Sequence, residues 1–88
     1  EYSSQAVAVL DDLLVRGARE GLFRSDVAAR DVYLMIAAMG YFYLSNRFTL
    51  SAFLGEALET GPALAHWEAF LIDSVLRTVA PAAPLTTA

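Results

Sequence analysis

The run VYLMIAAMGYFYLSN, from Val32 to Asn46, contains fifteen residues and no charge. At about 100° per residue it shows no polar face between Val32 and Leu44, so it predicts a helix that is covered on all sides. It is too short to cross a membrane, which takes about 20 apolar residues. The fold therefore depends on what covers this helix, either the rest of the chain or a partner.

A first helix is predicted before this run, from about Gln5 to Glu20. Ser3 or Ser4 suits the N-cap position, and Gly21 can end the helix in the left-handed conformation. One stripe of side chains recurs at helical spacing and is expected to face inward: Val7, Leu10, Leu14 and Ala18.

After a short connection over residues 22–26, the apolar helix is predicted to run to about Ser45. Asn46 and Arg47 are interpreted as its C-terminal cap, because a cation is favourable at the negative end of the helix dipole. The aromatic run would then end at this cap.

A short turn of helix is predicted from Leu50 to Leu54, capped by Thr49 and closed by Gly55. After a loop, a third long helix is predicted with Pro62 at its first position and Val79 near its end, because proline is favoured at the first helical position. Residues 81–88 are expected to form a disordered tail.

The chain has more apolar side chains than 88 residues can bury. Its hydrophobic share is 57%, against about 45–50% in an average globular domain. So short a chain buries only about 60–65% of its unfolded surface. The predicted class is all-α, with three main helices plus the short turn helix. A two-fold homodimer, in which the second and third helices pair with their copies as a four-helix bundle, is the simplest way to cover the surplus.

Several classes of function are disfavoured by the residues present. Six arginines, no lysine and ten acidic residues give a net charge of −4, which opposes nucleic-acid binding by these residues themselves. There is no cysteine, and scattered carboxylates with one histidine do not make a metal site. No cofactor is expected. No signal peptide is visible at residues 1–5, so the cytoplasm is the default location.

His66 is the only histidine, and Asp73 and Ser74 follow it in the same predicted helix. A separation of seven residues is about 10 Å along a helix axis, which is too far for a His–Asp hydrogen bond. A solvated helix face with an Asp73–Arg77 ion pair is the better interpretation, and the chain is not expected to be an enzyme.

Two segments flank the aromatic helix. REGLFRSDV, residues 19–27, forms the connection before it, and SNRFTLSAFLG, residues 45–55, forms the turn after it. With the long final helix, these segments resemble the C-terminal regulatory domain of tetracycline-repressor-like (TetR-family) transcriptional regulators, over about residues 5–80. One departure is Ala28-Ala29, where the family often has Asp-Pro. Asp26 or Ser25 is then expected to cap the aromatic helix.

The resemblance implies a helical body that binds an effector and dimerises through its last two long helices, with residues 1–80 as the later part of that body. The implied partners are a second copy, a small apolar or amphipathic effector, and operator DNA through an N-terminal helix-turn-helix domain that these residues do not contain. No membrane partner is expected. The alternative is a stand-alone helical dimerisation module without a ligand, and a basic helix-turn-helix encoded upstream would distinguish the two.

Candidate site residues follow from the arcs of the aromatic helix. One arc is expected to pack against the third helix or its copy, because its small residues allow a close approach: Tyr33, Ala37, Gly40 and Leu44. The effector cavity is expected to be lined by the Met/Phe arc and the first helix: Leu10, Leu14, Met35, Met39 and Phe42. The dimer interface is expected to include Leu34, Tyr41, Leu64, Trp67, Leu71 and Val75.

Overall fold

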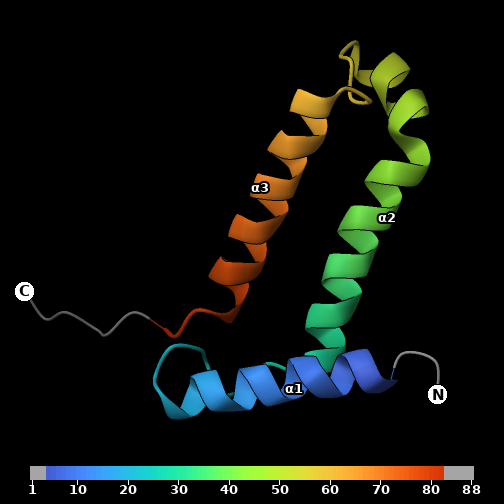
Figure 1. Ribbon diagram of the computed structural model, residues 1–88. Coiled ribbons are helices and arrows are strands. Elements are labelled where there is room, and N and C mark those ends of the chain that lie inside the picture. The colour runs from blue at the N-terminus through green and yellow to red at the C-terminus, as the bar shows by residue number, and fades with distance from the viewer. Residues whose placement is uncertain (1–3, 83–88) are drawn as a thin grey trace, which may run out of the picture.

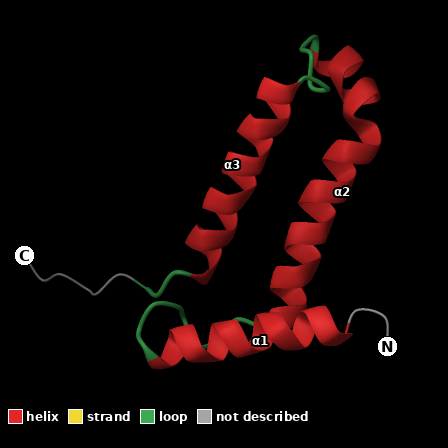
Figure 2. Cartoon of the chain, viewed as in Figure 1, coloured by secondary structure: helices red, strands yellow, loops and turns green. Residues whose placement is uncertain are grey.

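The computed structural model describes residues 4–82, which contain three helices and no strand (Figures 1 and 2). The helices are α1 (Ser4–Arg19), α2 (Ala29–Leu54) and α3 (Gly61–Val79). In Figure 1, α2 and α3 form an antiparallel hairpin, and α1 lies crosswise at its open end. α2 is the central element, because it contacts both other helices. The predicted all-α class is confirmed, while the four-helix dimer stays a prediction.

The core lies where α1 crosses the base of the hairpin. Val7 and Leu10 of α1 pack against four buried side chains that come from all three helices: Leu14, Ala29, Val32 and Val79. The inward stripe predicted for α1 is thereby confirmed for Val7, Leu10 and Leu14, whereas Ala18 is half-buried and lies outside this core. Ser4 is the first residue of α1, whereas the alternative cap Ser3 and most of the predicted tail lie outside the described residues.

The end of α1 is held by a close contact inside the chain. Gly21 has a φ of 76°, the left-handed conformation that favours glycine. The chain then folds back, and the Leu22 N–H donates to the Gly17 carbonyl at 2.8 Å. The ring of Phe23 lies so close to Gly17 that an added Cβ would be 2.1 Å from the Phe23 Cδ2 atom. Gly17 is therefore required by the packing of Phe23.

α2 continues through the predicted break, so the interpretation of Asn46 and Arg47 as a C-terminal cap is wrong. The Asn46 side chain donates to the Phe42 carbonyl four residues back, at 2.9 Å, a bond that an uninterrupted helix accommodates. The helix ends only at Gly55, with a φ of 70°. The separate turn from Leu50 to Leu54 and its cap at Thr49 are likewise wrong, because both lie inside α2. No glycine or proline stands between Gly40 and Gly55 to break it.

The predicted N-cap of α2 is also wrong. Ala28 occupies the N-cap position and its side chain makes no capping bond. Asp26 binds Arg24 instead, with the two Arg24–Asp26 bonds at 2.6 and 2.8 Å. The Arg24 N–H donates to the Val79 carbonyl at 2.8 Å. The connection between α1 and α2 is therefore tied to the end of α3.

α3 begins close to the predicted position. The Thr60 hydroxyl accepts from the Ala63 N–H and caps the helix, with Pro62 in the first turn. None of the three helices between residues 4 and 82 has the length and the apolar content that crossing a bilayer takes.

The molecule is one layer of helices. Its extents are 46 × 45 × 18 Å, and a helix with its side chains is about 10–12 Å across. Only five hydrophobic residues of the described chain are buried: Leu14, Ala29, Val32, Tyr43 and Val79. Both broad sides of the α2–α3 hairpin are therefore uncovered.

Replacing Gly17 by Ala should destabilise the chain by about 1–3 kcal/mol, the usual cost of overpacking, although alanine is the better helix former. Thermal unfolding followed by circular dichroism measures the change. Gly61→Ala is the control, because a Cβ there would meet nothing within 4 Å. Equal melting temperatures for the two variants would contradict the packing assigned to Phe23.

The hydrogen bonds from Arg24 lower the pKa of the Asp26 carboxyl from its ordinary 3.8 to about 2. Because the folded-state pKa lies below the unfolded one, the pair stabilises the fold above about pH 4, and this contribution is lost as the pH falls toward 2. Carbon-13 NMR titration should show the low pKa, and Arg24→Ala should return it toward 3.8. Arg30→Ala is the matched control and should leave the pKa of Asp26 unchanged.

Candidate functional site

α2 and α3 meet at one aromatic junction. The rings of Tyr43 and Trp67 stack with centroids 5.2 Å apart and an interplanar angle of 17°. Phe70 stacks on Trp67, also at 5.2 Å. The Trp67 indole N–H donates to the Met39 carbonyl at 3.1 Å. Tyr43 is buried, so this junction fixes the level at which the two helices face each other.

The loop between α2 and α3 is held by the same surface of α2. The Leu58 N–H donates to the Ser51 hydroxyl at 2.8 Å, and the Tyr43 hydroxyl donates to the Leu58 carbonyl at 2.8 Å. Both backbone polar groups of Leu58 are thus bound by side chains of α2. The tip of the hairpin is therefore preformed. A preformed surface binds a partner with a smaller loss of conformational entropy.

The junction divides the hairpin into two faces. Adjacent helix residues point about 100° apart, so the neighbours of Tyr43 and Trp67 lie on opposite sides of the plane of the hairpin. We call one side the Gly40 face, defined by Gly40 and Leu44 of α2 and by Leu64, Glu68 and Leu71 of α3. We call the other the His66 face, defined by Phe42 of α2 and by Ala63 and His66 of α3. Each face carries its own cavity.

The cavity of the His66 face lies at the tip of the hairpin and has a volume of about 660 Å³. Phe42, Leu50 and Leu54 of α2 form one wall, and His66 lies on the α3 side. Ligand cavities usually measure about 300–1,000 Å³ and are mostly apolar with a few polar groups. This cavity has that character, although it is open to solvent on one side.

The groove of the Gly40 face has a volume of about 510 Å³ and is almost wholly apolar. Gly40 lies in the middle of α2, where glycine costs about 0.5–1 kcal/mol relative to alanine. A Cβ at Gly40 would meet nothing within 4 Å, in contrast to Gly17. No contact in the described chain therefore requires a glycine at this position.

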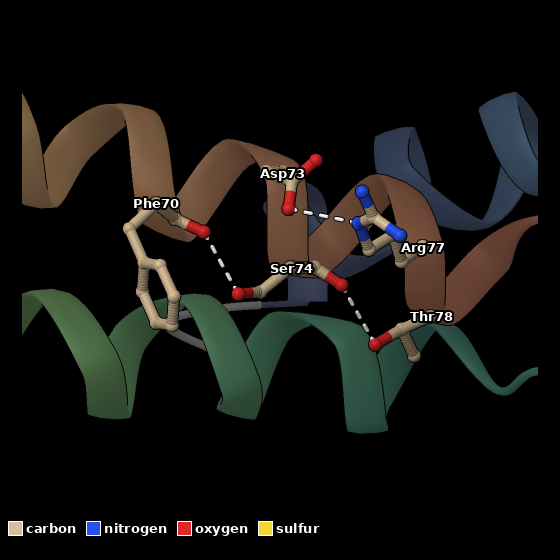
Figure 3. A network of polar contacts seen from close by, with 5 residues as sticks. All are labelled: Phe70, Asp73, Ser74, Arg77 and Thr78. Atoms are coloured by element: carbon tan, nitrogen blue, oxygen red, sulfur yellow. Dashed lines mark hydrogen bonds and ion pairs between the residues drawn. The ribbon is translucent and has the colours of Figure 1, made fainter.

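α3 has a charged side formed by Asp73 and Arg77 (Figure 3), which is also the side of His66 by helical spacing. Asp73 and Arg77 form an exposed ion pair at 2.9 Å, as predicted. The Ser74 hydroxyl donates to the Phe70 carbonyl at 2.7 Å, and the Thr78 hydroxyl donates to the Ser74 carbonyl at 2.8 Å. The charged side suits water, whereas the opposite, apolar side of α3 requires cover.

The residues predicted to line an effector cavity are not gathered in one cavity. Leu10 and Leu14 pack in the core beneath the hairpin. Met35 and Met39 are half-buried, on the same side of α2 as Phe42 by helical spacing. Phe42 is exposed and lines the tip cavity. Only the part of the predicted set on α2 shares a surface.

The residues predicted for the dimer interface fall into three places. Leu64, Trp67 and Leu71 line the groove of the Gly40 face. Val75 packs against the core. Leu34 and Tyr41 lie on the outer edge of α2, where they are 55% and 74% exposed.

Three features of this region were missing from the sequence-based expectations. They are the stack of Tyr43 on Trp67, the binding of Leu58 by Ser51, and the position of Glu68 in the groove. Gly40 and Leu44, from the arc expected to pack against the third helix or its copy, do line the groove beside α3. No local pattern marks Ser51, because its partner lies seven residues away in a loop.

Comparison with known proteins gives two matches. The family described as Tetracyclin repressor-like, C-terminal domain, matches residues 1–75. The HTH-type transcriptional repressor NicS of Pseudomonas putida is 47% identical over 75 residues, which are 85% of this chain and 35% of that protein. The chain thus spans about a third of the length of this relative. No solved structure matches the chain.

Proposed function

The chain belongs to the tetracycline-repressor-like family through its C-terminal domain, and from this premise we propose that it is the effector-sensing and dimerisation region of a DNA-binding transcriptional regulator. The relative is named as a transcriptional repressor of the helix-turn-helix type. Operator DNA would be bound by a helix-turn-helix domain outside these 88 residues, in the cytoplasm. The chain would then be a regulator and not an enzyme.

We place the dimer interface on the Gly40 face. The observation that carries this assignment is Gly40 itself, a glycine inside a helix that its own chain does not require. A glycine in such a position permits close approach of another backbone. The apolar side chains of Leu44, Leu64 and Leu71 surround it. Two copies that meet through this face would form a four-helix bundle with a self-complementary two-fold interface.

The solvent side of α3 supports the same choice of face. Asp73 and Arg77 are exposed on the His66 face, and a dimer built on that side would desolvate them. Burying charged groups is costly unless the pair stays hydrogen-bonded. An interface on the Gly40 face leaves this ion pair in water.

We place the effector against the Met/Phe arc of α2, on the His66 face. Met35 and Met39 are half-buried and Phe42 is exposed, so other parts of the full-length protein or a ligand would cover them. Methionine adapts its shape to varied apolar molecules. The effector would be small and apolar or amphipathic, in agreement with the apolar walls of the tip cavity that Phe42 shares.

The contact between Tyr43 and Trp67 would couple effector binding on α2 to the packing of the dimer. Phe42 would contact the effector, and its neighbour Tyr43 is the residue on which Trp67 of α3 stacks. An effector that shifts α2 at Phe42 would therefore change how α3 packs on it. Between two arrangements of the dimer, the effector would favour the one that it binds more tightly, and this population shift would change the spacing of the DNA-binding domains.

Replacing Gly40 by Leu should weaken the dimer at least about tenfold, because the side chain would hold the two helix layers apart. Helical content should stay equal or rise, since leucine forms helix better than glycine. Sedimentation equilibrium measures the dissociation constant, and circular dichroism measures the helix. His66→Leu adds the same side chain to the other face and should leave the dimer unchanged. A wild-type chain that is monomeric at micromolar concentration would refute the proposed interface.

Replacing Met39 by Trp should obstruct the effector surface. A thermal-shift screen of small apolar and amphipathic compounds on the full-length protein would first identify stabilising ligands. Those ligands should bind Met39→Trp at least about tenfold more weakly, as expected when a bulky ring occupies the site. Tyr41→Ala, on the outer edge of α2, is the control and should keep their affinity. The opposite result would show that the two sides of α2 have been assigned the wrong way round.

A further inference from the structure

Most arginines of the described chain are bound by a carboxylate close to them in sequence. Four ion pairs form in this way: Asp12–Arg16, Arg24–Asp26, Arg30–Asp31 and Asp73–Arg77. Within residues 4–82, neither Arg47 nor Glu68 takes part in an ion pair. Glu68 lines the groove of the Gly40 face, which we have proposed as the dimer interface, and Arg47 lies on the same side of α2 as Gly40 and Leu44 by helical spacing.

The Arg47 guanidinium lies on the Gly40 side of α2. It donates a hydrogen bond to the carbonyl of Leu44, a residue that lines the groove of that face. It also lies 4.8 Å from the centroid of the Phe48 ring, and such cation–π contact holds the guanidinium in place. The residue is half-buried. Arg47 does not itself line the groove, but these two contacts hold its cation beside Leu44, which does line it.

Glu68 is the one charged residue among those that line the groove of the Gly40 face. Its neighbours there are apolar side chains, including Leu64 and Leu71. In the single chain Glu68 is exposed, so water solvates its carboxylate. A second copy that covered the groove would remove this water. A carboxylate left unpaired in an apolar interface is strongly destabilising, so the dimer needs a cation at this place.

The heights of the two side chains along the hairpin make a pair across the interface feasible. Side chains on a helix lean toward its N-terminus. α2 and α3 are antiparallel (Figure 1), so Arg47 leans toward the base of the hairpin while Glu68 leans toward the tip. The bond from Arg47 back to Leu44 shows this lean directly. Trp67, next to Glu68, lies at the level of Met39 and Tyr43, so Arg47 is nearer the tip than Glu68 and the two side chains lean toward a common height.

We infer that Arg47 of one copy forms an ion pair with Glu68 of the second copy, and that two-fold symmetry repeats the pair. In a self-complementary interface, any contact between residue i and residue j occurs twice. The two pairs would fix the register of one hairpin on the other, in the way that interfacial charges specify partners and orientation. The inference rests on the proposed dimerisation through the Gly40 face and identifies its polar contact.

A charge-swap experiment on the full-length regulator tests this pair. Arg47→Glu and Glu68→Arg each place like charges across both copies of the contact, and each should raise the dimer dissociation constant by about 10- to 100-fold. The double variant Arg47→Glu with Glu68→Arg restores opposite charges and should return the constant to within about fivefold of the wild type. Arg77→Glu, which breaks an ion pair on the His66 face, is the matched control and should leave the dimer unchanged.

Circular dichroism checks that each variant is folded, and Arg47→Gln and Glu68→Gln, which remove a charge without reversing it, should weaken the dimer less than the reversals do. The inference is overturned if the single charge reversals leave the dimer unchanged, or if the double variant is as weak as the single ones. If Gly40→Leu weakens the dimer while the reversals do not, the proposed interface stands without this pair. A monomeric wild type overturns both.

Discussion

The stacking of Tyr43 on Trp67 is the contact on which the described structure depends. It joins the two helices that form the hairpin, and the hydrogen bond from Trp67 to the Met39 carbonyl sets their relative height. Each face of the hairpin is defined by the neighbours of these two residues. If the stack were lost, Gly40 would no longer face Leu71 across a groove, and Phe42 would no longer share a cavity with His66. A single aromatic contact therefore organises both candidate surfaces.

The outline of the fold could be predicted because residues with special backbone properties mark the ends of its helices. Gly21, Gly55 and Pro62 act through φ angles or a missing N–H, which are local effects that a sequence displays. The predicted break at Asn46 and Arg47 failed for a related reason. Neither residue forbids helix, and their side chains can bond to carbonyls of the preceding turn. Polar residues at one point of an apolar helix therefore do not by themselves mark its end.

The candidate site could be predicted only in part, because it depends on which helix faces which. Periodicity grouped Met35, Met39 and Phe42 on one arc correctly as a set of neighbours. It could not show that Leu10 and Leu14 would be used in a core beneath the hairpin. Trp67 was expected to face a second copy, and the structure packs it between α2 and α3. Which apolar residues a chain buries within itself, and which it leaves for a partner, follows from tertiary contacts that a single periodic pattern does not contain.

The binding of Leu58 by two side chains of α2 has a consequence for how sequences of this type can diverge. Ser51 holds the amide of Leu58 and Tyr43 holds its carbonyl, so the number of residues between position 51 and position 58 is constrained even though the loop is on the surface. Surface loops ordinarily accept insertions and deletions easily. In this loop the identities of the intervening residues can vary except at Gly55, whose φ of 70° favours glycine, while an added or deleted residue would move Leu58 out of reach of both partners. Related sequences should therefore differ in the composition of this turn and agree in its length.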